Sequence, residues 1–148
     1  AVPNLLSSRR ASNEASALSA LRVISEAEAG YIGSMGSGNY GTANELYVAH
    51  LIDSTVAAAN NLNVGGNPPR NTAKNGYRFR IIARDVNPVT HAPSNYVVSA
   101  IPSSTSGVTQ TGATRLCLRE DGVLRGSGQN IGSHYNYAQC GFANTYEP

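Results

Sequence analysis

Residues 17–32 carry an apolar stripe with the period of an α-helix, and this stripe constrains the fold more than any other feature of the chain. Its members are Ala17, Ala20, Leu21, Ile24, Ala27, Tyr31 and Ile32. Ser19, Arg22 and Glu26 occupy the opposite side of the same helix. A helix of this kind buries its apolar side against another layer of structure. Glu28 interrupts the stripe, and we expect its side chain to bend to the margin of the contact.

The helical face becomes polar before residue 17. Arg10 and Glu14 lie one turn apart on it, at a spacing that suits an ion pair, and Asn13 lies beside them. A domain core does not readily accept such a face. We therefore predict a helix over residues 1–33 that leaves its own domain near Asn13, with its start projecting beyond the core.

The rest of the chain predicts an antiparallel sheet preceded by a short helix. A capping box opens residues 42–61, where we expect that helix. Residues 77–82 alternate in the manner of a half-exposed strand, and residues 95–102 have the composition of a second strand. Residues 115–128 predict a hairpin with an Asp-Gly turn. The expected fold class is α+β, a long amphipathic helix packed on a sheet of roughly four strands.

Composition and the cysteines narrow the class of protein further. The 148 residues fit one domain, and a net charge of +2 gives no indication of a polyanionic partner. Cys117 and Cys140 match neither a CxxC redox motif nor a zinc knuckle. A disulfide between them is the simplest use, and it would place the chain outside the cytoplasm. Two unrelated buried thiols are the alternative.

Motifs of catalysis are not found in the sequence. The GxGxxG pattern of residues 36–41 follows a predicted helix, whereas the dinucleotide fingerprint follows a strand. His50 has Asp53 three residues away, while His91 and His134 lie in loops without a neighbouring acid at a known spacing. We therefore expect no enzyme, no catalytic residue, no cofactor, no metal site and no small-molecule substrate.

Two further groups of side chains could form contacts, and each has an ordinary alternative. Arg78 and Arg80 share one face of a predicted strand, where they could bind phosphate or simply be solvated. Aromatic residues gather around the second cysteine, and they suit either a contact surface or packing under a loop. The aromatic residues that could form a surface contact are Tyr135, Tyr137, Phe142 and Tyr146.

The opening "AVPNLLSSRRASNEASALSALRVISEAEAGY" resembles the stretch of a type IV pilin that follows its hydrophobic N-terminal membrane segment. Members of that family have Pro-Asn-Leu, a basic turn and an Ala- and Glu-rich amphipathic helix here, and many have a C-terminal cysteine pair. The resemblance is specific over about the first thirty residues. It implies a pilin-like fold and a missing apolar helix half ahead of Ala1, so that the chain as given is a soluble part of the subunit.

The resemblance also implies a division of residues 1–148 as a single head domain. Its parts are the C-terminal half of the helix with its protruding start (1–33), a connecting region with a short helix (34–76), the antiparallel sheet (77–127) and the disulfide region with the tail (117–148). The helix face on the sheet comprises Ala17, Ala20, Leu21, Ile24, Ala27 and Tyr31. The implied assembly interface comprises Val2, Pro3, Leu5, Leu6, Arg9 and Arg10. A solvated helical turn is the alternative for the two arginines.

The function implied is structural: a subunit that polymerises into an extracellular pilus for adhesion, motility or DNA uptake. Its partners would be other pilin subunits, the inner-membrane assembly machinery, and surface or DNA ligands. The precursor would be anchored in the inner membrane. The first alternative is the major pseudopilin of a type II secretion system, which commonly carries a calcium loop in place of the cysteine pair. An alternative of another class is a secreted ligand-binding or hydrolytic module.

Overall fold

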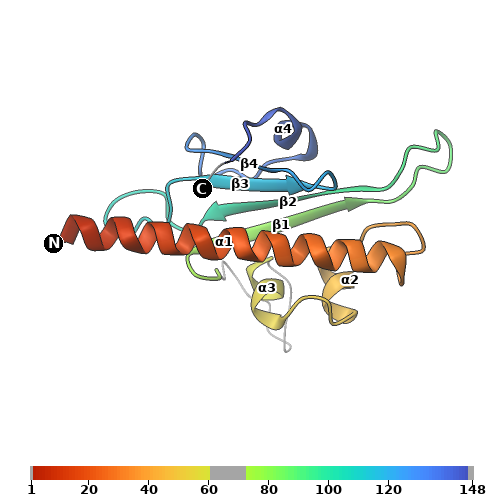
Figure 1. Ribbon diagram of the computed structural model, residues 1–148, viewed down its shortest axis with the longest axis horizontal. Helices are drawn as coiled ribbons and strands as arrows, with labels where there is room; N and C mark the ends of the chain where they lie inside the picture. The colour runs from red at the N-terminus through yellow and green to blue at the C-terminus, as the bar shows by residue number, and fades with distance from the viewer. Residues whose placement is uncertain (1, 61–72, 147–148) are drawn as a thin grey trace.

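A long N-terminal helix lies along one face of a four-stranded antiparallel sheet (Figure 1). The computed structural model describes residues 2–60 and 73–146, with side chains from residue 5 onward. The helix is α1 (Val2–Gly33). The expected α+β class, with a long helix, a four-stranded antiparallel sheet and a disulfide, is confirmed.

The sheet is a meander whose spatial order is the order of the strands in the chain. Its strands are β1 (Tyr77–Arg84), β2 (Asn95–Pro102), β3 (Arg115–Arg119) and β4 (Leu124–Ser127). Every neighbouring pair is antiparallel; a tight turn joins β3 to β4, whereas longer loops join β1 to β2 and β2 to β3. The predicted Asp-Gly hairpin joins β3 to β4, and Gly122 adopts a φ of 74° that favours glycine at this turn.

The main core lies between α1 and the sheet. Alternation along the strands places every second side chain toward the helix. The buried strand residues of this core are Tyr77, Phe79, Tyr96, Val98, Ala100, Leu116 and Leu118. The buried residues that α1 contributes are Ala17, Leu18, Ala20, Leu21, Ile24, Ala27 and Tyr31. Ile32, at the end of the stripe, is half-buried.

Residues 42–60 form two short helices, where the sequence predicted one. They are α2 (Ala43–Val48) and α3 (Ser54–Ala59). The expected capping box opens α2, but His50 takes a φ of 59° and turns the chain before a second helix can start. Asp53 then caps α3 by accepting a bond from the backbone N–H of Val56 at 2.8 Å. Both helices contact β1, and α2 also contacts α1.

The C-terminal segment crosses the face of the sheet opposite α1 (Figure 1). The disulfide between Cys117 of β3 and Cys140 is confirmed. It ties down a short helix that the sequence analysis did not predict, α4 (Tyr137–Phe142), which Asn136 caps. A second, smaller core forms around the disulfide, with Val97 of β2 and Tyr135 buried against it. The tail therefore gives the sheet a covering layer on its outer face.

Candidate functional site

The start of α1 is the part of the helix least covered by the rest of the molecule. Leu5 is 69% exposed and Arg9 is exposed, whereas Leu6 is half-buried. Figure 1 shows the N-terminus at the far end of α1, away from the strands. Val2 and Pro3 belong to α1, but their side chains lie outside the described residues. The described apolar side chains of this start are thus Leu5 and Leu6.

The sequence predicted that α1 leaves the core near Asn13. In the structure the helix keeps contact with the head for about one more turn toward the N-terminus, as far as Arg10. The connection between β2 and β3 folds back onto the helix and offers it backbone carbonyls. Arg10 donates from Nε to the carbonyl of Gln110 at 3.2 Å and from its second terminal nitrogen to that of Gly107 at 3.0 Å. Asn13 donates from Nδ2 to the carbonyl of Thr111 at 2.9 Å. The helix therefore projects freely only before Arg10, because this loop satisfies the polar face that a core would reject.

Glu14 also has a partner other than the one expected. Within the described residues it accepts a hydrogen bond from the hydroxyl of Tyr146 at 2.5 Å, while Arg10 binds the loop instead of pairing with Glu14. Burial and the bond to Glu14 raise the pKa of Tyr146 to about 12, so the phenol stays protonated as the donor. The end of the tail is thereby fastened to the first half of α1.

Glu28 is fully buried, and the expectation that its side chain bends to the margin of the contact was wrong. The segment between α1 and α2 folds over the helix, and the backbone N–H of Gly41 donates to Oε2 of Glu28 at 2.8 Å. The other oxygen, Oε1, has no partner within the described residues. Burial raises the pKa of this carboxyl to about 7, although the bond from Gly41 opposes the rise. A Cβ at Gly41 would lie 3.0 Å from the ring of Tyr31, so glycine permits this close approach.

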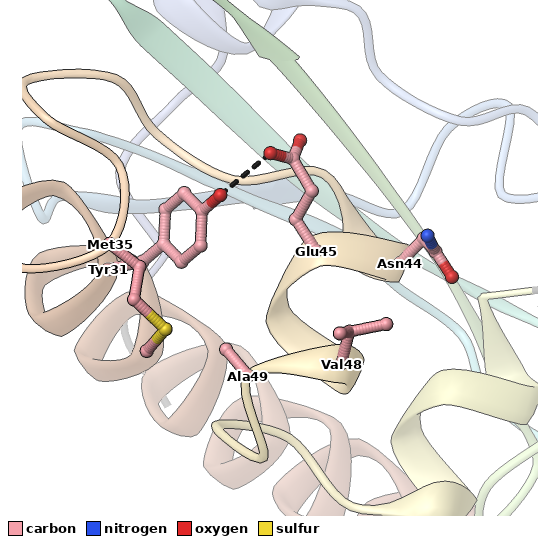
Figure 2. Close-up of a pocket in the computed structure, with 6 residues that line it drawn as sticks. All are labelled: Tyr31, Met35, Asn44, Glu45, Val48 and Ala49. Carbon is pink, nitrogen blue, oxygen red and sulfur yellow. Dashed lines mark hydrogen bonds between the residues drawn. The ribbon is translucent and has the colours of Figure 1, made fainter.

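An open groove lies between the end of α1 and α2 (Figure 2). Its volume is about 260 Å³, and its lining residues are Tyr31, Met35, Asn44, Glu45, Val48 and Ala49. The hydroxyl of Tyr31 donates to Oε2 of Glu45 at 2.7 Å across it. This bond raises the pKa of Tyr31 and lowers that of Glu45. Met35 and Val48 are more than half exposed, so the groove is an apolar surface with one hydrogen-bonded pair.

The aromatic side chains of the tail do not form one surface. Tyr135 is buried, which contradicts its assignment as a surface contact, because the guanidinium of Arg115 lies 3.8 Å from its ring centre and its hydroxyl binds Ser127. Tyr137 is half-buried beneath Arg119, at 3.7 Å. Tyr146 is fastened to α1, as described above. Phe142 alone among these four is largely exposed, at 91%.

The three histidines lie in separate surroundings. His50 and His91 are exposed and both occupy turns with a φ of 59°. The carboxylate of Asp53 caps α3, so it does not orient His50. His134 lies 2.9 Å through Nδ1 from Oγ of Ser99, and burial lowers its pKa to about 4. The described ranges 2–60 and 73–146 contain no group of three residues that could hold a metal ion.

Comparison with known proteins identifies no relative of this chain. No protein-family model, curated protein sequence or solved structure matches the chain. A search of the described helices finds none long and apolar enough to cross a membrane. Function is therefore inferred from the contacts of the described residues.

Proposed function

We propose that this chain is a structural subunit of a type IV pilus, which polymerises into an extracellular filament. The carrying observation is the division of α1 into two parts. From Ala17 onward its apolar face is buried on the sheet, whereas Leu5 and Arg9 remain exposed beyond Arg10, the last described attachment of the helix to the head. An element that is anchored at one end and uncovered at the other suits assembly with further copies.

Burial would drive this assembly. Leu5 and Leu6, together with an apolar helix half ahead of Ala1, would pack against equivalent helices in the centre of the filament, with Arg9 at its edge. Full burial of an aliphatic side chain contributes about 1.5 to 3 kcal/mol. Two such side chains are too few to offset the several kcal/mol of lost translational and rotational freedom, so the apolar half supplies the rest. Repetition of one contact by rotation and rise produces an open filament.

The contacts of the head support this role because they connect the helix to the loop before β3 and to the tail as well as to the sheet. The loop before β3 holds Arg10, and the tail holds Glu14 through Tyr146. The disulfide in turn fastens the tail to β3. A pull on α1 along a filament would thus be distributed over the sheet. The cysteine pair also favours a pilus over a secretion pseudopilus, for which the resemblance implies a calcium loop.

The test compares the chain as given with a version that carries an apolar extension of about twenty residues ahead of Ala1, reconstituted in lipid. We expect the short form to sediment as a monomer and the extended form to yield fibres by negative-stain microscopy. Leu5→Ser should weaken fibre formation, whereas the matched change Val89→Ser, at an exposed valine of the β1–β2 connection, should leave it intact. An extended form that stays dispersed, or equal effects of the two changes, would refute the proposal.

A further inference from the structure

The outer face of the sheet, which faces away from α1, carries a concentration of arginines. Because side chains alternate along each strand, the partners of the core residues project to this face. The arginines at these positions are Arg78, Arg80 and Arg84 of β1, Arg115 and Arg119 of β3, and Arg125 of β4. The chain as a whole has a net charge of only +2. The positive charge is thus gathered on one side of the molecule.

Each arginine of β3 and β4 has at least one partner on this face, although Nε of Arg115 and of Arg119, like that of Arg78, has no hydrogen-bond partner in the described residues. Arg119 and Arg125 pair with Glu120 and Asp121 at 3.9 and 3.0 Å. The guanidinium of Arg115 lies on the ring of Tyr135, and it donates to the carbonyl of Ser133 at 3.1 Å. These groups are held by the hairpin and by the tail.

Arg78 and Arg80 lie on the same face at the edge formed by β1, and their surroundings differ from those of the arginines on β3 and β4. β1 is an edge strand of the sheet, and within residues 2–60 and 73–146 no further strand pairs with its outer side. Within residues 2–60 and 73–146, neither arginine forms an ion pair. Arg80 donates one hydrogen bond, to the carbonyl of Tyr135 at 3.2 Å, and is otherwise exposed. Nε of Arg78 is buried and has no hydrogen-bond partner in the described part of the chain.

His134, a residue of the tail, is the third member of a group with Arg78 and Arg80. Arg80 is paired across the sheet with Ser99, and Oγ of Ser99 lies 2.9 Å from Nδ1 of His134. The same oxygen accepts the backbone N–H of Tyr135 at 3.0 Å. Ser99 is 1% exposed, and a buried hydroxyl hydrogen needs an acceptor, which Nδ1 supplies. The neutral ring then carries its proton on Nε2 as a further donor. Besides burial, the charges of Arg80 and Arg78 lower the pKa of His134.

We propose that Arg78, Arg80 and His134 form a binding site for a phosphoryl group. Two guanidinium groups on one strand face present forked donors that match phosphate oxygens. A phosphate oxygen would also give the buried Nε of Arg78 the acceptor that it lacks. The tetrahedral anion accepts bonds from several directions, which suits donors that come from β1 and from the tail. The group could belong to free phosphate or to a phosphodiester strand, and the two sources share this chemistry.

The experiment titrates the protein with inorganic phosphate, and separately with a short single-stranded oligonucleotide, at constant ionic strength. Two-dimensional NMR follows the arginine Nε–H signals and the ring of His134. We expect saturable shifts at Arg78, Arg80 and His134, and a rise in the pKa of His134 on binding because the anion favours the charged ring. Saturation by phosphate would assign a site for the free anion. Saturation by the oligonucleotide alone would assign a site for a phosphodiester.

The matched variants are Arg78→Gln and Arg80→Gln against Arg22→Gln, which removes the same charge from the exposed side of α1. Each of the first two should weaken binding at least tenfold, and Arg22→Gln should change it less than twofold. Arg80→Lys retains the positive charge but not the forked donors of the guanidinium group, and it should bind with intermediate affinity. This conservative variant separates a loss of binding from a loss of folding. The proposal is overturned if neither ligand gives saturable shifts. It is also overturned if Arg22→Gln weakens binding as much as Arg78→Gln and Arg80→Gln do.

Discussion

Replacement of Glu28 by glutamine should remove a pH dependence from the stability of the fold. Glu28 is fully buried, and one of its oxygens has no partner in the described residues. Burial raises its pKa from 4.5 to about 7. Between these two values the folded state holds a proton that the unfolded state releases. Stability therefore falls as pH rises through this interval, and the loss ends above about pH 7.

The magnitude follows from the width of the interval. Each pH unit within it changes the free energy of unfolding by about 1.4 kcal/mol, which gives about 3 kcal/mol in total. Glu28→Gln cannot ionise, so it lacks this loss. Its amide places N–H donors near the unpartnered position, at a constant cost of about 1 to 3 kcal/mol. The difference in stability between variant and parent should thus shift by about 3 kcal/mol in favour of the variant between pH 4 and pH 8.

Urea unfolding followed by circular dichroism at intervals of half a pH unit measures this difference. The matched control is Glu26→Gln, which changes an exposed carboxylate two residues earlier on α1. Its difference from the parent should vary by less than 1 kcal/mol over the same range. A Glu28→Gln difference that is equally flat would refute the reasoning, because it would mean that the buried carboxyl is ionised at little cost.

Two further predictions concern the tail and the helix. Reduction of the disulfide, or Cys140→Ser, should lower the free energy of unfolding by about 3 kcal/mol, since the bond closes a loop with a separation of 23 residues; chemical denaturation with and without reductant measures this, and an unchanged midpoint would contradict it. Ile24→Asp should abolish cooperative thermal unfolding because it places a charge in the core, whereas Arg10→Ala, which removes two hydrogen bonds to a loop, should cost about 1 to 3 kcal/mol. Equal effects at these two positions would mean that the helix is buried from its start.

Local periodicity was sufficient to predict the main layers. The stripe that includes Leu21 and Ile24 repeats every 3.6 residues, and a helix with such a stripe buries it. Alternation in β1 separated Tyr77 and Phe79, which are buried under α1, from Arg78 and Arg80 on the other face. These features depend on residues that lie within one or two turns of each other. The same local information was enough for the β3–β4 hairpin.

Contacts between distant segments decided the rest. Arg10 binds a loop about a hundred residues later in the chain, and Tyr146 reaches back to Glu14, so no local pattern could show where α1 leaves the core. The burial of Glu28 depends on the loop that brings Gly41 to it.

The candidate site for a phosphoryl group depends both on local periodicity and on contacts between distant segments. The strand period placed Arg78 and Arg80 together, but His134 joined them only through the fold of the tail. Periodicity specifies which face of an element a side chain occupies, because neighbouring residues set the backbone dihedral angles. Which distant group meets that face depends on how the loops and the tail close over the sheet, and only the tertiary structure determines that.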